Sequence, residues 1–276
     1  MKMELFDLKN KVALVFGGNG YLGKEFCKAL LENNATVYCC DSNTDESKEI
    51  TMLKKNYSEK FEMMNVNATD KNDLLQLKEK ILEKEKTIDI LINSTSAKSD
   101  DFYLPFEDVS LESWNVGLLG NLTIPFLTIQ TFIPIMKKQR KGSIINISSV
   151  YGIVGNDQRM YVGTNLHEIY VKKSPDLERI YSHGSYNAAK GGLINFTRYL
   201  AAYYGGYNIR INCISPGGIY HEKEDKIFLK NYSERTPLGR KANLDEINGS
   251  IIFLASDASS YVTGHNLVVD GGFTIW

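Results

Sequence analysis

Short apolar runs alternate with longer amphipathic stretches along the whole chain. The runs are rich in β-branched residues, which favours strands, and the longer stretches repeat apolar residues at helical spacing. Strands are expected at 12–16, 36–40, 61–65, 88–93, 143–147, 209–214 and 267–269, and helices at 22–32, 71–84, 112–138, 186–204 and 244–255. This alternation predicts an α/β fold in which helices cover both faces of a doubly wound parallel sheet.

Two stretches interrupt the alternation. Residues 155–185 are polar, rich in tyrosine and long for a connection, which is typical of a functional loop or lid. Residues 218–240 are charged, and we expect a flexible flap there. With no internal repeat or break in composition, residues 1–276 are expected to form a single domain, with both stretches over the substrate site.

Composition narrows the classes of partner. Lys and Arg total 32 against 33 Asp and Glu, a net charge of -1 with no basic stretch, which argues against nucleic acid. No apolar run reaches the roughly 18 residues of a membrane span, and the first residues lack the pattern of a signal peptide. The four cysteines and four histidines have no metal-ligand spacing. We therefore expect a cytoplasmic protein without a metal or membrane partner.

A glycine-rich turn follows the first expected strand. Gly17, Gly20 and Gly23 would let backbone amides approach a pyrophosphate at the start of the next helix. The second expected strand runs into Asp41, whose carboxylate could accept hydrogen bonds from the adenosine ribose and would repel a 2′-phosphate. No Lys or Arg stands at Asn19 or directly after Asp41, so NAD(H) is favoured over NADP(H). An ordinary turn capped by Asp41 remains the alternative.

A tyrosine and a lysine stand four positions apart in an expected helix. Tyr186 and Lys190 would share one helical face, and a nearby cation lowers the pKa of a phenol toward a useful range for proton exchange. Upstream, Ser148 and Ser149 end an apolar strand, where a hydroxyl could hold a substrate oxygen. A surface Tyr–Lys pair and a serine-capped turn are the alternatives.

Together these motifs resemble the classical short-chain dehydrogenase/reductase family. The resemblance runs from Leu8 to Gly272 and is carried by GGNGYLG (17–23), Asp41, NAT (67–69), ILIN (90–93), NL (121–122), ISSVYG (147–152), YNAAK (186–190), INCISPGG (211–218), TPLGR (236–240) and YVTGHNLVVDGG (261–272). It implies a Rossmann fold and a hydride transfer between nicotinamide and a secondary alcohol or its ketone.

The resemblance also implies roles for residues. Tyr186 would be the general acid/base, Lys190 would lower its pKa and bind the nicotinamide ribose, Ser149 would polarise the carbonyl, and Asn121 would hold a water in the proton relay. Cofactor contacts are implied for Gly17, Asn19, Gly20, Tyr21, Leu22, Gly23, Asp41, Asn67, Ala68, Asn93, Tyr186, Lys190, Pro216, Gly217 and Ile219. The chain departs from the family pattern in having Phe16 for threonine, Asn67 for aspartate and NSTS (93–96) for NNAG. A helix-interior asparagine without a catalytic role is the alternative for Asn121.

The long stretch 155–185 bears on the substrate. Aromatic and hydrogen-bonding side chains there suit a polyhydroxylated ligand, and cations suit a phosphate or carboxylate. The residues concerned are Arg159, Tyr161, His167, Tyr170, Lys172, Lys173, Arg179, Tyr181 and His183. Tyr151-Gly152, YVGT (161–164) and SPGGIY (215–220) look similar to bacterial sugar-pathway dehydrogenases, including the flagellin-modification type, which implies a sugar or sugar-phosphate substrate. A solvated or oligomer-facing excursion, an acyl or lipid-like ketone substrate, and a catalytically silent dinucleotide sensor remain alternatives.

Assembly is implied by the resemblance as well. Residues 244–255 and 261–272 look like the family's subunit contacts, which implies a homodimer or a homotetramer. A monomer whose aromatic C-terminus packs on itself is the alternative.

Overall fold

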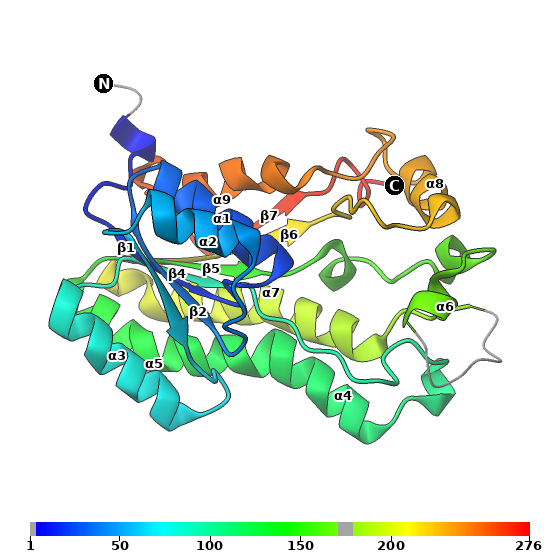
Figure 1. The fold of residues 1–276 in the computed structure, drawn as a ribbon, viewed down its shortest axis with the longest axis horizontal. Coiled ribbons are helices and arrows are strands. Elements are labelled where there is room, and N and C mark those ends of the chain that lie inside the picture. Colours follow the sequence, from blue (N-terminus) through cyan, green and yellow to red (C-terminus); the bar gives the residue numbers. More distant parts are fainter. Residues whose placement is uncertain (1–3, 171–178) are drawn as a thin grey trace.

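Seven parallel strands form one sheet in the order β3-β2-β1-β4-β5-β6-β7 (Figure 1). The computed structural model describes residues 4–170 and 179–276. The strands are β1 (Val12–Phe16), β2 (Thr36–Asp41), β3 (Phe61–Asn65), β4 (Ile90–Asn93), β5 (Gly142–Ile147), β6 (Ile209–Pro216) and β7 (Asn266–Val269). All seven expected strands are therefore confirmed, with bounds that shift by a few residues.

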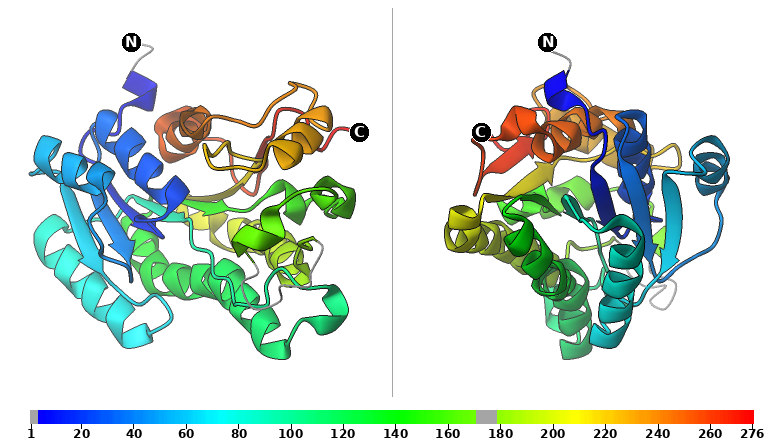
Figure 2. Two further views of the ribbon diagram at one scale, coloured as in Figure 1. Left: turned by 45° about the vertical axis from the view of Figure 1, so that its right-hand side comes forward. Right: turned by 90° about the vertical axis from the view of Figure 1, so that its left-hand side faces the viewer.

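Helices cover both faces of the sheet, which confirms the doubly wound fold (Figure 2). One apolar core lies between the sheet and α1, α2 and α9, and the other lies between the sheet and α3, α5 and α7. Burial on both faces explains why β1 is an unbroken apolar run and why the asparagines of β4 and β5, Asn93 and Asn146, hydrogen-bond each other within the core. The helices are α1 (Tyr21–Glu32), α2 (Lys48–Asn56), α3 (Lys71–Glu85), α4 (Leu111–Leu118), α5 (Ile124–Gln139), α6 (Leu166–Tyr170), α7 (Gly184–Tyr204), α8 (Lys226–Glu234) and α9 (Asn248–Ala255).

The helix expected at 112–138 is interrupted. A π-helical turn at Leu119–Thr123 separates α4 from α5. The stretch Leu111–Gln139 is long and apolar enough to cross a membrane by length and composition, a test that core helices of soluble proteins also pass. Half of its most apolar window is buried within the protein, and α5 packs against α3, β4 and β5. We therefore describe it as a core helix.

The two stretches that break the alternation contain short helices. Residues 155–185 include α6, and residues 218–240 include α8, which begins after Asp225 because that carboxylate accepts the amide hydrogens of Ile227 and Phe228. Both helices lie at the same end of the molecule (Figure 1). Phe228 of α8 stacks on Tyr161 with ring centres 5.5 Å apart. The stretches thus pack against one another beside the sheet.

Candidate active site

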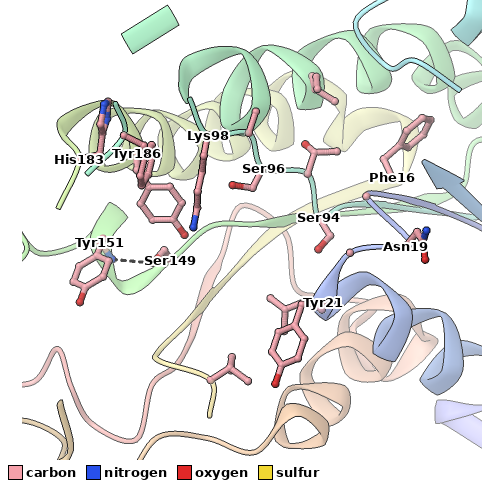
Figure 3. A pocket seen from close by; sticks show the side chains of 18 of the residues that line it. Phe16, Asn19, Tyr21, Ser94, Ser96, Lys98, Ser149, Tyr151, His183 and Tyr186 are labelled. Carbon is pink, nitrogen blue, oxygen red and sulfur yellow. Dashed lines mark hydrogen bonds between the residues drawn. The ribbon is translucent and has the colours of Figure 1, made fainter. Parts of the chain in front are cut away.

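A cleft of about 870 Å³ runs across the carboxyl ends of the strands. Its lining comes from the segments that follow β1, β2, β3, β4, β5 and β6, together with both stretches that break the alternation. Asn19 and Tyr21 of the glycine turn lie at one end, and Ser149 and Tyr186 lie at the other (Figure 3). Asp41 lines the cleft beside the glycine turn. This is where open α/β sheets bind ligands, at the switch in strand order between β1 and β4.

The glycine turn is a close-packed cradle. Gly17 has a φ of +73°, and a Cβ there would lie 2.6 Å from the backbone oxygen of Ser94. A Cβ at Gly23 would lie 2.0 Å from the backbone oxygen of Gly17, so α1 can start this close to the turn only without side chains at these positions. Gly20 caps α1 without a side-chain hydrogen bond, and the first turn carries no acidic residue. Its amides therefore suit an anion such as a pyrophosphate.

Asp41 is tied to this turn. Its Oδ2 accepts a hydrogen bond from the amide of Asn19 at 3.1 Å, and its Oδ1 accepts one from the amide of Asn43 at 3.0 Å. The Asn19 side chain donates in turn to the backbone oxygen of Asn43 at 2.9 Å. The carboxylate keeps acceptor capacity beyond these bonds and lines the cleft.

Asn67 and Ala68 line the same end of the cleft. The side-chain oxygen of Asn67 accepts hydrogen bonds from both the amide and the hydroxyl of Thr69, at 3.1 and 2.7 Å. The side-chain oxygen of Asn67 is therefore already engaged within the protein. The backbone amide of Asn67 donates to the Asp73 carboxylate at 3.1 Å, so the side-chain nitrogen is the donor that Asn67 can offer a ligand.

Ser149 and Tyr186 come together at the opposite end, from β5 and α7. Figure 3 shows the Tyr186 hydroxyl directed toward Ser149. The Ser149 hydroxyl also accepts a hydrogen bond from the amide of Tyr151 at 3.2 Å, so it caps the turn that follows β5 and still lines the cleft. The serine-capped turn is therefore present, and the role of the Ser149 hydroxyl toward a substrate oxygen stays a prediction.

Lys190 lies beneath Tyr186, one helical turn further along α7. Its ammonium is 5.5 Å from the centre of the Tyr186 ring and donates to the backbone oxygen of Ile147 at 2.7 Å. Burial lowers the pKa of Lys190 to about 8. Burial also raises the pKa of Tyr186, while its hydrogen bond to Ser149 acts in the opposite direction. In the protein without ligand, burial therefore outweighs the groups that favour the phenolate.

Three hydrogen bonds hold α7 against β5. Besides the bond from Lys190 to Ile147, the Ser148 hydroxyl donates to the backbone oxygen of Lys190 at 2.8 Å. The Asn146 side chain donates to the Thr197 hydroxyl at 2.9 Å. These bonds are buried, so they fix the position of Tyr186 relative to Ser149 independently of the long connection between them.

Asn121 lies in the π-helical turn and is fully buried. Its side-chain nitrogen donates to the backbone oxygen of Gly117 at 2.9 Å, whereas its side-chain oxygen has no hydrogen-bond partner among the described residues. Isolated π-turns are frequent at functional sites, and a buried acceptor without a protein partner suits an ordered water. Asn121 does not line the cleft directly.

Four other residues with an implied catalytic or cofactor role lie behind the cleft wall: Gly23, Asn93, Lys190 and Pro216. Asn93 shows why. Its side chain donates to Asn146 at 2.9 Å and accepts from Thr128 at 2.7 Å, so it points into the core. The segment just after it, Ser94 to Lys98, lines the cleft instead.

The end of the cleft that Ser149 and Tyr186 line, called the catalytic end below, is also lined by residues from other segments. From residues 155–185 come Asn156, Tyr161, Ser182 and His183, whereas Lys172 and Lys173 lie outside the described residues. The His183 ring stacks on Phe102 with centres 4.5 Å apart. The sequence analysis missed the lining residues Lys98, Phe102, Tyr103 and Lys241, which no motif marks. Tyr151 belongs to the ISSVYG motif, and Phe228 and Tyr232 to the stretch 218–240, but the sequence analysis gave none of the three a role. Across residues 4–170 and 179–276, no three His, Cys, Asp or Glu side chains gather as a metal site would require.

Comparison with known proteins shows which family the chain resembles in sequence and in structure. Residues 11–163 match the family model described as short chain dehydrogenase, and residues 176–274 match one described as Enoyl-(Acyl carrier protein) reductase. The 3-oxoacyl-(acyl-carrier-protein) reductase FabG of Thermotoga maritima is 32% identical, over 97% of this chain and 99% of that protein. Post-translational flagellin modification protein A of Campylobacter coli is 29% identical, over 96% of this chain and 99% of that protein. The crystal structure of a short chain dehydrogenase from Leptospira borgpetersenii with bound NAD⁺ superposes with a TM-score of 0.82 at 34% identity, over 97% of this chain and 94% of that one.

Proposed function

Because the chain belongs to the short-chain dehydrogenase/reductase family, we propose that it is an NAD(H)-dependent oxidoreductase that acts on a secondary alcohol or its ketone. One observation carries the proposal. A single cleft holds a glycine cradle and Asp41 at one end, and Tyr186 with Ser149 at the other, above Lys190. A dinucleotide and a small alcohol would therefore meet at the phenol.

The residues present fit a dinucleotide. The tight turn at Gly17 and the uncapped amides of α1 suit the pyrophosphate, and Asp41 suits the adenosine ribose. Asn67 and Ala68 would border the adenine, while Gly217 and Ile219 would border the nicotinamide. When bound, NAD⁺ would accept the hydride at its nicotinamide ring and add a positive charge near the phenol.

The side chains of this chain would manage the proton. Ser149 would donate a hydrogen bond to the substrate oxygen, which keeps that oxygen within reach of the Tyr186 hydroxyl. Tyr186 would take the alcohol proton during oxidation and return it during reduction. Lys190, whose ammonium lies 5.5 Å from the centre of the Tyr186 ring, would stabilise the phenolate. The unpartnered oxygen of Asn121 would hold a water through which the proton reaches solvent.

The proposal is tested by Tyr186→Phe, which removes one oxygen and leaves the ring in place. We expect this variant to lose turnover of secondary alcohols by at least roughly a hundredfold, while its affinity for NADH stays within about twofold of wild type. The measurements are absorbance of reduced nicotinamide during turnover and a fluorescence titration with NADH. Turnover that survives in Tyr186→Phe would refute the role of the phenol. Binding of NADH without turnover in both proteins would favour a dinucleotide sensor.

Asp41 supports NAD(H) over NADP(H). A 2′-phosphate on the adenosine ribose would face this carboxylate, and the lysines that line the described cleft, Lys98 and Lys241, are at the catalytic end. The Leptospira relative contains bound NAD⁺. Titration with both reduced cofactors tests this, and tighter binding of NADPH would contradict it.

For the substrate we propose a sugar or sugar phosphate. The catalytic end is lined by tyrosines 103, 151, 161 and 232 and by Asn156 and His183, side chains that hydrogen-bond hydroxyl groups. The similarity to a flagellin modification protein is compatible with this substrate. Reduction of an acyl thioester ketone is the second candidate, and the similarity to an acyl-carrier-protein reductase favours it. Parallel assays with a panel of sugars and with acetoacetyl-coenzyme A separate the two.

We also propose a cytoplasmic homo-oligomer, either a dimer or a tetramer. β7 is an edge strand on which Val268 is exposed, and the nearby Tyr261 is fully exposed. An edge strand with apolar side chains is a favourable surface for pairing with a second copy. Sedimentation velocity tests the proposal, and a monomer at micromolar concentration would contradict it.

A further inference from the structure

His183 stands directly before α7, three residues ahead of Tyr186, and both side chains line the catalytic end of the cleft (Figure 3). The residue is buried, with 3% of its surface exposed. One face of the imidazole stacks on the Phe102 ring, with centres 4.5 Å apart and planes 6° apart. Both ring nitrogens form hydrogen bonds within the protein. The imidazole is therefore held by its neighbours on several sides.

The hydrogen bonds determine which nitrogen of His183 carries the proton. Nδ1 accepts the amide hydrogen of Ser185 at 3.1 Å, and a backbone amide can only donate. In the neutral imidazole the proton therefore lies on Nε2, which is 3.1 Å from the hydroxyl of Ser113 in α4. Ser113 is hydrogen-bonded to Ser99, whose hydroxyl donates to Asp101 at 2.8 Å. A chain of donors thus runs from the imidazole to a carboxylate.

The first turn of α7 depends on this cap. Amides in the first turn of a helix have no partner within the helix, and Tyr186 lies in this turn. The bonds that hold α7 against β5 involve Lys190 and Thr197, one and three turns further along. The Ser185 hydroxyl also lies 2.7 Å from Nδ1 of His183. His183 thus holds the turn that carries Tyr186.

The same turn packs closely against α4. A Cβ at Gly117 would lie 1.9 Å from the Ser185 hydroxyl oxygen, so the two helices are in contact at this point. The backbone oxygen of Gly117 accepts a hydrogen bond from the Asn121 side chain at 2.9 Å. His183 is bonded to both sides of this contact, to Ser185 on α7 and to Ser113 on α4. A shift of the imidazole would therefore move the first turn of α7 against α4.

We propose that His183 is a positioning residue for Tyr186, which holds the first turn of α7 against α4 and the Phe102 ring so that the phenol points toward Ser149. The inference rests on the proposed function and deepens it, because it names the group that keeps the proton-transferring phenol aligned. His183 itself exchanges no proton with the substrate. A displacement of about 1 Å at a reacting group can cost about a hundredfold in rate, so a hydrogen-bond network behind the phenol can control kcat.

The test removes the bond between His183 and Ser113 from each side. His183→Asn keeps a side-chain acceptor for the Ser185 amide but is too short to reach Ser113. Ser113→Ala keeps the imidazole and loses the hydroxyl, and the double variant loses the same bond once. Ser143→Ala is the matched control, because its hydroxyl is also buried and donates to the backbone oxygen of Leu254 at 2.7 Å, where β5 begins.

The kinetic constants kcat and KM are measured on the sugar, or on acetoacetyl-coenzyme A, whichever wild type turns over fastest, together with NADH affinity and Tm. We expect each single variant to lose about tenfold in kcat, with KM and NADH affinity within about twofold of wild type. The double variant should match His183→Asn, because the two substitutions remove one shared bond. Ser143→Ala should lower Tm about as much as Ser113→Ala and keep its kcat.

A second measurement needs no substrate. Hydrogen exchange of the amides of residues 184–190 is followed by mass spectrometry. These amides should exchange about tenfold faster in His183→Ala, which has no cap, than in wild type. His183→Asn should restore most of the protection, and Ser143→Ala should match wild type.

Unchanged kcat in both single variants, losses that multiply in the double variant, or equal exchange in His183→Ala and wild type would overturn the inference. The proposed function fails by other signs, which are absent NADH binding or turnover that survives Tyr186→Phe. The two failures are therefore distinguishable.

Discussion

The contact between Gly23 and the glycine turn can be tested with one methyl group. Gly23→Ala places a Cβ 2.0 Å from the backbone oxygen of Gly17 and 2.8 Å from both its carbonyl carbon and the Cα of Gly18. All three atoms belong to the backbone, so no flexible side chain can move aside. The turn itself must shift away from α1.

Two effects of this substitution oppose one another. Alanine is favoured over glycine inside a helix by about 0.8–1.0 kcal/mol. Overpacking costs about 1–3 kcal/mol, and a rigid backbone contact belongs at the upper end of that range. The net loss is then about 1–2 kcal/mol, which for a chain of this size lowers Tm by roughly 2–8 °C. The turn is also the proposed pyrophosphate site. NADH affinity should therefore fall about tenfold for each 1.4 kcal/mol of binding free energy lost when the turn is displaced.

Gly249→Ala is the matched control. Gly249 lies in α9, is exposed, and has no atom within 4 Å of the added Cβ. Only the helix-propensity gain applies there, so Tm should rise by roughly 2–4 °C and NADH affinity should not change. Thermal unfolding by circular dichroism and a fluorescence titration with NADH give both quantities. If Gly23→Ala raises Tm as Gly249→Ala does, the close contact does not exist and the argument for the cradle is wrong.

Three further predictions concern charge. Replacing Asp41 by alanine and Ser42 by arginine should shift the ratio of NADPH to NADH affinity by about tenfold or more toward NADPH, and an unchanged ratio in the fluorescence titration would contradict the role of Asp41. Burial lowers the pKa of His183 below 6.5, so His183 binds a proton more readily in the unfolded chain than in the folded protein. The free energy of unfolding should therefore fall as pH drops below about 6.5. His183→Asn should flatten that part of the profile of Tm against pH, and a profile as steep as that of wild type would argue against the histidine. The Asp157 carboxylate pairs with Arg159 and with Arg235 at the end of α8, and the hydrogen bond to Arg159 lowers the pKa of Asp157 to about 2. Its stabilisation is therefore present above pH 3.8 and lost toward pH 2, so Asp157→Asn should lower Tm at neutral pH and remove that acid loss.

The strands were predictable from the sequence because burial on both faces leaves little room for polar residues in β1, β4 and β5. α2 was missed because only Ile50 and Leu53 are buried, and two residues give too weak a periodicity. The π-turn at Leu119–Thr123 could not be seen either. Its sequence continues the apolar pattern of the helices around it, and the extra residue in the turn changes backbone hydrogen bonds rather than residue types.

The site residues also differ in how well the sequence predicts their positions. Gly17, Asp41, Ser149 and Tyr186 stand at fixed positions relative to strand or helix ends, so a sequence that predicts those ends also predicts their place in the cleft. Lys98 follows β4 by five residues, and its direction depends on how the loop folds back onto Phe102 and Tyr103. No periodicity describes such a loop, so the place of Lys98 in the cleft becomes visible only from contacts between side chains.

The hydrogen bonds between β5 and α7 have an evolutionary consequence. Asn146, Ser148 and Lys190 anchor α7 against β5 through buried hydrogen bonds that involve no residue between 155 and 182, while His183 caps the first turn of α7. Descendants of this gene could lengthen, shorten or exchange that excursion and inherit the same proton-transfer pair. New substrate specificity would then come from a changed excursion above the cleft, while β5 and α7 stay the same.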